Sequence, residues 1–210
     1  MNSSAFTLIE LLIVIIIASI LAVVMIPHFE RDNLRESTNQ VIRHIQYTQH
    51  LAMNSDMYNA NDINWPNMYW KIAFRTSKNC YTIYSDTDKD FLNDATESAI
   101  DPLTKVRLYA GNNCNASSLN NDALLLEKSY GIDTITLTIP VGATPHMNDC
   151  NTNTKMYLAF DNLGRPHTNV SSPTGGIIKN DCLITLKSGI HTAIIKVTAE
   201  TGYVKIDSIN

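Results

Sequence analysis

The fold is decided by the stretch Ala5-Phe-Thr-Leu-Ile-Glu10-Leu-Leu-Ile-Val-Ile-Ile-Ile-Ala18-Ser-Ile-Leu-Ala-Val-Val-Met-Ile-Pro27. From Phe6 to Ile26 it is an almost entirely apolar run of 21 residues. As a helix, at about 1.5 Å per residue, such a run is about 31 Å long, which matches the hydrocarbon thickness of a membrane. Its one acid is Glu10. A carboxylate inside a membrane helix costs about 2.5–3.5 kcal/mol, so we expect Glu10 to be a functional group with a partner.

Two other kinds of targeting segment fit this run less well. A cleaved secretory signal has a basic region, an apolar core of about 7–15 residues and a cleavage site of small residues. Residues 1–5 contain no basic residue, and the apolar run is longer than such a core. A plain signal anchor stays open as the simpler alternative. Charge asymmetry does not set its orientation, because the flank after Pro27 carries both signs.

The run Ala5-Phe6-Thr7-Leu8-Ile9-Glu10, followed by aliphatic residues, resembles the N-terminus of the type IV pilin and type II secretion pseudopilin superfamily. In that family a prepilin peptidase removes a short leader before a phenylalanine, which is then N-methylated. The resemblance implies cleavage between Ala5 and Phe6 and an assembly role for Glu10, the fifth residue from Phe6. Pro27 also stands where the family commonly has proline. The chain departs from the family at Ala5, which replaces the usual Gly, and in a leader without Lys or Arg.

The chemistry of Glu10 is consistent with this role. A buried carboxylate is tolerated when it is paired with a cation, and cleavage would create an ammonium group at Phe6. We therefore expect a single-pass anchor in the bacterial inner membrane, with a periplasmic head, that later becomes the core of a filament. The expected partners are other pilin or pseudopilin subunits, the prepilin peptidase, an inner-membrane assembly platform and, before assembly, membrane lipid.

Together with this resemblance, the remaining sequence predicts an α+β fold, and the whole chain divides into four parts. These are a leader (1–5), a transmembrane and filament-core helix (6–27), an amphipathic helix (28–58) and a β-rich head (59–210). We expect a kink at Pro27, where a helical hydrogen bond is lost, and a helix end at about Met57. Residues suited to one buried helix face recur at steps of three and four, and they are Leu34, Thr38, Val41, Ile42, Ile45, Thr48, Gln49 and Ala52.

Alternating and β-branched residues predict an antiparallel sheet in the head, against which the amphipathic helix packs. The hairpin signature is clearest where Met68–Phe74 and Cys80–Tyr84 flank a polar turn. Gly189 and Gly202 are predicted turns between the last strands. The further predicted strands are Thr134–Ile139, Met156–Phe160, Cys182–Lys187, Thr192–Thr198 and Tyr203–Asp207.

Four cysteines stand beyond the apolar run: Cys80, Cys114, Cys150 and Cys182. An even number in an exported domain predicts two disulfides, and sequence alone allows three connectivities. We expect the pairs Cys80–Cys114 and Cys150–Cys182, because short loops close at lower entropic cost.

The distal sequence adds a second resemblance. The run Tyr157–Pro166, followed by a closing hairpin that ends at Ile206, is similar to the H-type minor pseudopilins and their FimT-like relatives. This resemblance implies a minor subunit that is structural rather than catalytic, in a type II secretion pseudopilus or a type IV pilus. The alternative is a DNA-binding or surface-binding minor pilin of a competence or adhesion pilus, since some FimT-like relatives bind DNA through a tail hairpin.

For DNA, the candidate residues here are Lys187, Lys196 and Lys205. With 16 basic and 20 acidic residues, the net charge of −4 predicts no general affinity for nucleic acid. Phosphate-driven affinity scales with the number of cations in contact, and few are available. We do not expect DNA as a partner.

The best candidate ligand site is the segment Asp86-Thr-Asp88-Lys-Asp90-Phe91-Leu92-Asn-Asp94-Ala-Thr-Glu97. Its donors follow the order of a twelve-residue calcium loop. The predicted calcium ligands are the carboxylates of Asp86, Asp88, Asp90, Asp94 and Glu97 and the carbonyl of Leu92. The alternative is a solvated acidic loop, because Phe91 stands where that loop has Gly and flanking helix patterns are absent. No cofactor is required.

Two further groups of residues have both a functional and a simpler structural interpretation. The run His146–Cys150 contains residue types found in nucleophile sites, but no catalytic motif accompanies it and Cys150 is expected to be bridged. Trp65, Tyr69 and Trp70 would form either a stacking platform for a surface ligand or part of the packed core. We expect the packed core.

Overall fold

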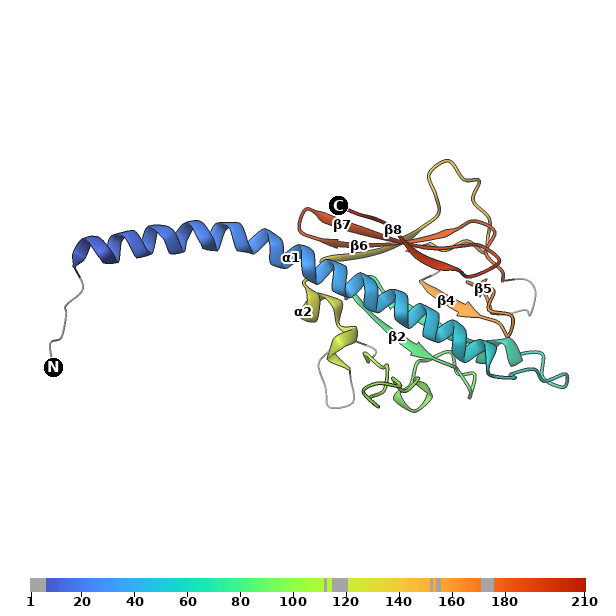
Figure 1. The fold of residues 1–210 in the computed structure, drawn as a ribbon. Coiled ribbons are helices and arrows are strands. Elements are labelled where there is room, and N and C mark those ends of the chain that lie inside the picture. Colours follow the sequence, from blue (N-terminus) through green and yellow to red (C-terminus); the bar gives the residue numbers. More distant parts are fainter. Residues whose placement is uncertain (1–6, 112, 115–120, 152, 154–155, 171–175) are drawn as a thin grey trace.

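The computed structural model describes residues 7–111, 113–114, 121–151, 153, 156–170 and 176–210, and for residues 23–32 it describes the backbone alone. The fold is α+β, as the sequence predicts: a long N-terminal helix projects from a head of antiparallel sheets (Figure 1). The predicted leader, and with it the cleavage position between Ala5 and Phe6, lies outside the described residues.

The helix α1 spans Leu8–Met53, which is 46 residues without interruption. The kink predicted at Pro27 is not shown and stays a prediction. The predicted end at about Met57 is wrong, because α1 stops at Met53. Asn54 ends it: its backbone and side-chain amides both donate to the carbonyl of His50, at 3.1 and 2.7 Å. A short polar side chain that binds the last turn in this way favours termination over a further turn.

The two halves of α1 have different surroundings. Every described residue from Leu8 to Ala22 is exposed, and the large aliphatic side chains there expose at least half of their surface. Of the residues that the structure describes, no helical segment combines the length and the apolar character needed to span a membrane. The membrane span at residues 6–27 stays a prediction.

The second half of α1 buries the predicted face against the head. Each buried aliphatic side chain of this kind contributes about 1.5–3 kcal/mol relative to an exposed one. Ile42 and Gln49 are half-buried at the edge of the face. The fully or almost fully buried members of the predicted set are Leu34, Thr38, Val41, Ile45, Thr48 and Ala52.

The head contains two four-stranded antiparallel sheets within the described residues, where the sequence predicted one sheet. Strand periodicity shows which residues form strands but not which strands pair, and this is why the prediction missed the division. The first sheet has the order β2-β1-β4-β5, with β1 Trp70–Arg75, β2 Cys80–Tyr84, β4 Tyr157–Phe160 and β5 Pro166–His167. The second has the order β3-β6-β7-β8, with β3 Thr134–Thr138, β6 Cys182–Ser188, β7 His191–Val197 and β8 Val204–Ile209.

Short helical elements connect the strands. They are the 3-10 turns η1 (Trp65–Met68), η2 (Ala95–Glu97) and η3 (Asp122–Leu124) and the helix α2 (Leu126–Tyr130). Neither α2 nor β5 can be predicted from the sequence, since five and two residues are too few for a periodic pattern.

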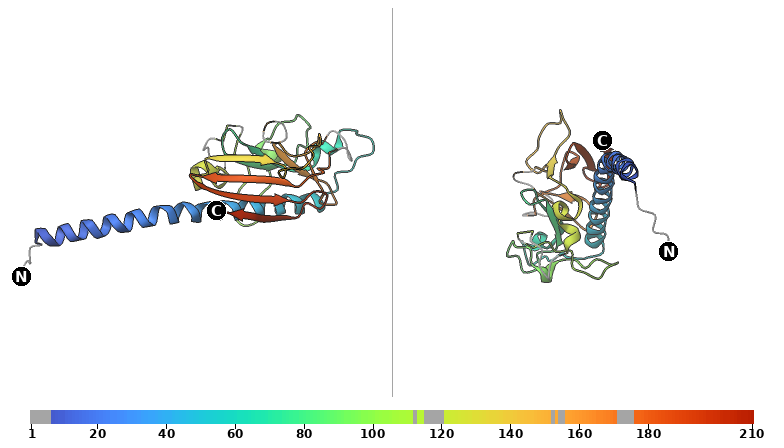
Figure 2. Two further views of the ribbon diagram at one scale, coloured as in Figure 1. Left: turned by 90° about the horizontal axis from the view of Figure 1, so that it is seen from above. Right: turned by 90° about the vertical axis from the view of Figure 1, so that its left-hand side faces the viewer.

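The helix α1 lies along one side of the head and contacts strands of both sheets (Figure 2). Gln49 joins them at one point, because its side-chain amide donates to the carbonyl of Gly164 at 2.7 Å and to that of Thr201 at 3.2 Å. Gly164 lies in the turn between β4 and β5, and Gly202 lies in the turn between β7 and β8. Both have positive φ, +77° and +66°, so one helical side chain fixes a turn of each sheet.

Two disulfides confirm the predicted pairing. Cys80 is bonded to Cys114, and Cys150 is bonded to Cys182. The first ties the start of β2 to the long irregular segment that follows that strand. The second ties the segment after β3 to the start of β6. Each bond therefore restrains one of the long loops against a strand.

His44 of α1 belongs to a largely buried hydrogen-bond chain between α1 and β2. Gln40 donates to the Tyr81 hydroxyl at 2.9 Å, and that hydroxyl lies 2.7 Å from Nδ1 of His44. Because the hydroxyl already accepts from Gln40, it can donate to Nδ1 of a neutral imidazole. Burial lowers the pKa of His44 to about 4, an effect that nearby Asp101 opposes and Arg43 reinforces.

We predict that Gly202→Ala destabilises the head by about 2–4 kcal/mol. A Cβ there would lie 2.6 Å from the Gly164 carbonyl oxygen and 2.7 Å from Nε2 of Gln49, on a backbone with φ +66°. Gly142→Ala is the matched control: φ is +85°, but nothing lies within 4 Å of its Cβ. The free energy of unfolding of Gly142→Ala should fall only by the cost of placing alanine at this positive φ, about 1 kcal/mol. Urea unfolding of the full chain measures both, and equal losses would contradict the clash.

We also predict that the free energy of unfolding falls by about 2 kcal/mol between pH 7 and pH 5 through His44 alone. Its pKa is about 4 in the folded state and about 6.5 in the unfolded state. The unfolded chain therefore takes up the proton first, and stability is lost as the pH falls through the window from 6.5 to 4. His44→Gln should flatten this part of the profile. His50→Gln, at an exposed position of the same helix, should not.

Candidate functional site

The N-terminal candidate residue Glu10 closes the start of α1. Thr7 is the N-cap, and Glu10 stands at the third helical position. The Glu10 carboxylate accepts from the backbone amide of Thr7 at 3.0 Å and from its hydroxyl at 2.9 Å, while the Thr7 hydroxyl accepts from the Glu10 amide at 3.4 Å. This reciprocal arrangement is a capping box. This capping box was not predicted, although Thr-x-x-Glu before an apolar run is its sequence signal.

The acidic loop after β2 is the second candidate site. Donor atoms of Asp86, Asp88 and Glu97 lie within 4.8 Å of one another, and so do those of Asp88, Asp90 and Asp94. The predicted carboxylates therefore form two groups that share only Asp88. The amide of Leu92 donates to Asp90 at 2.7 Å. The six-residue calcium set stays a prediction.

Asp86 is the unusual member of this loop. Its side chain is fully buried, and neither carboxylate oxygen accepts a hydrogen bond of normal geometry, although a weak contact with the backbone amide of Phe91 slightly lowers its pKa. Its nearest counter-charge is the ammonium of Lys71 on β1, which is also buried and lies 3.7 Å away, beyond hydrogen-bonding distance. Burial raises the pKa of Asp86 and lowers that of Lys71, and each partner offsets part of the effect on the other. A pair of this kind carries a large desolvation cost.

Glu97 is held in place by hydrogen bonds to one of its two oxygens. Oε1 accepts from the amide and the hydroxyl of Thr87 at 2.6 and 2.7 Å and from the amide of Asp88 at 3.2 Å. Oε2 is buried and accepts nothing within the described structure. Phe91 adopts φ +66°, the left-handed conformation for which calcium loops use Gly at this position. Phe91 is therefore no obstacle to a calcium loop of this kind, because its backbone adopts the left-handed conformation that the position requires.

The three lysines of the DNA alternative do not form one cluster. Lys196 on β7 stands opposite Lys205 on β8, but Lys187 stands opposite Thr192, near the other end of the β6–β7 pair. Lys196 is also paired with Asp181 at 3.2 Å. The placement leaves few cations together for phosphate contacts.

The motif that carries the distal resemblance builds a turn. Asp161 is buried and accepts four hydrogen bonds: from the amides of Leu163 and Arg165, from Nε of Arg165, and from His167. Burial raises the pKa of Asp161, but these bonds outweigh it and lower the pKa to about 2. Gly164 supplies the positive φ of the turn. The role of this motif in the described structure is therefore to connect β4 to β5.

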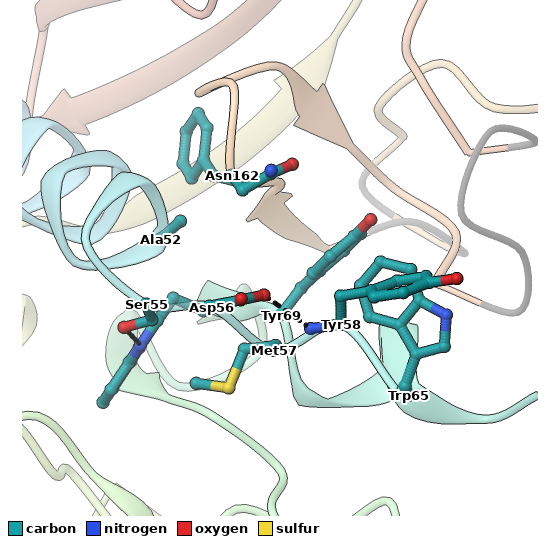
Figure 3. Close-up of a pocket in the computed structure, with 10 residues that line it drawn as sticks. Ala52, Ser55, Asp56, Met57, Tyr58, Trp65, Tyr69 and Asn162 are labelled. Carbon is teal, nitrogen blue, oxygen red and sulfur yellow. Dashed lines mark hydrogen bonds between the residues drawn. The ribbon is translucent and has the colours of Figure 1, made fainter. Parts of the chain in front are cut away.

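The aromatic residues near the end of α1 pack among themselves. Trp65 makes edge-to-face contacts with Tyr58 and Tyr69, both with 5.4 Å between ring centroids, and Trp70 donates to the Ser55 hydroxyl at 3.0 Å. They border a cavity of about 140 Å³ beside Ala52 and Asn162 (Figure 3). Tyr69 is buried, which agrees with the packed-core interpretation.

The residues of the enzyme alternative have structural roles. Cys150 is bonded to Cys182. Asp149 accepts from the amides of His146, Lys179 and Asn180, between 2.8 and 3.1 Å, and so fixes the segment around that disulfide.

Comparison with known proteins gives one finding. A model of the prokaryotic N-terminal methylation motif matches residues 1–26, which include Ala5, Phe6 and Glu10. No curated protein and no solved structure matches the chain. The motif implies processing by a prepilin peptidase and assembly with other subunits. It confirms the N-terminal resemblance, while the minor subtype stays a prediction. Through residues 1–26, this chain carries the hallmark motif of the type IV pilin and pseudopilin family.

Proposed function

We propose that this protein is a minor pilin or pseudopilin, a structural subunit of a type II secretion pseudopilus or a type IV pilus. Assembly is its activity. The segment from Phe6 anchors the precursor in the inner membrane and then packs in the filament. The head, outside the cytoplasm, makes the contacts with neighbouring subunits or with cargo.

The observation that carries the proposal is an apolar helix without a partner. The large apolar side chains between Leu8 and Leu21 are exposed over half or more of their surface, from 50% at Ile13 to 83% at Leu8. This part of the helix projects away from the head (Figure 1). Soluble monomers do not leave an apolar surface of this extent uncovered. A helix that is apolar all round is buried in a core or a membrane. Lipid before assembly and neighbouring helices after assembly would cover it.

The capping box gives Glu10 a role at each stage. In the precursor its carboxylate is satisfied by Thr7, which reduces the cost of its charge in an apolar setting. Cleavage after Ala5 would place an ammonium at Phe6, beside the positive end of the helix dipole, where a cation is disfavoured. A carboxylate at Glu10, on the same or a neighbouring subunit, would compensate it. The pairing would thus set the register of assembly.

We predict that Glu10→Leu leaves membrane insertion intact but lowers incorporation into filaments at least tenfold, which corresponds to about 1.4 kcal/mol or more. Removing one partner of a buried pair leaves the other charge uncompensated. The measurement is the ratio of this subunit in sheared filaments to that in membranes, by quantitative immunoblot in cells that express the other subunits.

Glu36→Leu is the matched control, because Glu36 is an exposed acid farther along the same helix. Its incorporation should equal that of the unmodified chain. Normal incorporation of Glu10→Leu would refute the assembly role of the carboxylate. A loss of Glu10→Leu from the membrane fraction would instead assign the residue to insertion.

A further inference from the structure

We propose that Asp86, Asp88 and Glu97 form a binding site for calcium at the end of β2. The inference goes beyond filament assembly and does not depend on it. It also differs from the calcium loop read from the sequence, because it takes only the first, second and last carboxylates of that set and leaves out Asp90 and Asp94.

The first support is the state of Asp86. A buried carboxylate normally accepts several hydrogen bonds, yet both oxygens of Asp86 are buried and neither accepts a hydrogen bond of normal geometry. The backbone amide of Phe91 makes only a weak contact with this carboxylate, the smallest of the effects on its pKa. Lys71 is too far from it to donate a hydrogen bond. The oxygens therefore lack the ligands that would offset their desolvation. A bound cation would supply that compensation directly.

The second support is the orientation of Glu97. Three donors on Thr87 and Asp88 hold its Oε1, and this leaves Oε2 buried without a partner. Hydrogen bonds that fix one oxygen and present the other are typical of the groups that orient metal ligands. Glu97 and Asp86 come from the two ends of the loop, so the buried carboxylate of Asp86 and the unpartnered Oε2 of Glu97 converge there.

The spacing and the chemistry of the donors favour calcium. The donor atoms of the three residues lie within 4.8 Å of one another, and two ligands on opposite sides of a calcium ion, each at about 2.3–2.6 Å, are about 4.6–5.2 Å apart. All three donors are carboxylate oxygens, the ligands of hard cations rather than of zinc or copper. Calcium also tolerates irregular geometry, whereas magnesium demands a near-ideal octahedron.

Lys71 acts as the internal competitor for this site. Its ammonium lies 3.7 Å from Asp86 and 5.0 Å from the centre of the Tyr84 ring. The ring offers the ammonium a second favourable contact through its π face. Calcium would take over the compensation of Asp86, and Lys71 would lean toward Tyr84. The affinity of the site is therefore expected to be limited by the displacement of one positive charge.

The position of the site indicates what the cation would do. The loop is already tied back to the strand, because Tyr84 and Ser98 form a β-bridge and the amide of Ser85 donates to the carbonyl of Glu97 at 3.3 Å. Calcium would join the two ends of the loop through their side chains as well. The exposed part of the loop, which includes Phe91 and Leu92, would be fixed as a result.

The test is calorimetric titration of calcium chloride into the full-length chain in detergent after treatment with a chelator. We expect one saturable site with a Kd of about 10⁻⁴–10⁻³ M. Saturating calcium should raise the thermal midpoint by several degrees, since a ligand that binds only the folded state stabilises it. Magnesium at the same concentration should have less than half of this effect. The absence of saturable heat, or an equal effect of magnesium, would overturn the proposal.

Isosteric variants separate the two ligand sets. Asp88→Asn and Glu97→Gln keep acceptor oxygens and remove charge, and each should weaken calcium binding at least tenfold. Asp94→Asn, the same change at an exposed acid of the same loop, should stay within about twofold of the unmodified chain. Near-UV circular dichroism without calcium establishes that each variant is folded. Equal weakening by Asp94→Asn would contradict the three-residue site.

Lys71→Met tests the competition. It should tighten calcium binding at least threefold and enlarge the calcium-induced rise in thermal midpoint, since Asp86 then lacks any counter-charge in the metal-free state. Unchanged or weaker binding would show that Lys71 does not compete with the cation.

Discussion

The burial of one face of α1 against two separate sheets is the contact on which the rest of the head depends. Leu34, Val41 and Ile45 are fully buried and belong to the same core as residues of both sheets. Gln49 fixes the position of the helix relative to both sheets, because its one amide group donates to a turn carbonyl of each sheet. The close approach requires glycine at Gly164 and Gly202, since a Cβ at either position would lie 3.0 Å or less from that amide. Helix and turns therefore fix one another.

This arrangement constrains how the protein can work as a subunit. The head is locked to the second half of α1, and the first half is its uninterrupted continuation. A contact that orients the apolar half would therefore orient the head. Glu10 is well placed for such a contact, because it lies within the first turn, where the helix dipole favours an anion and where its reach is set by the bonds to Thr7. The physical link between the N-terminal motif and the head is thus one continuous helix.

The parts of the fold with a strong local signal could be predicted. The helical period of residues 34–52, the strands around Ile72 and Ile184 and the cysteine pairs all follow from side-chain pattern and loop length. Strand pairing could not, because two sheets and one sheet have the same alternation. At the acidic loop the sequence shows the donor residues, but their division into two groups depends on the backbone path of the loop, which has positive φ at Lys89 and Phe91. The burial of Lys71 was hidden by its place on the polar face of an ordinary-looking strand.

Two buried aspartates within the same head make the acidic loop stand out. Asp161 and Asp86 are both almost inaccessible, at 1% and 0% side-chain exposure. Asp161 accepts four hydrogen bonds and forms a close ion pair with Arg165, at 2.7 Å. Asp86 accepts no hydrogen bond of normal geometry and has its nearest cation at 3.7 Å. At Asp161, whose role is to close a turn, the fold therefore provides the hydrogen bonds that a buried carboxylate needs. The proposed cation, held between both ends of the loop, would supply the partner that Asp86 lacks.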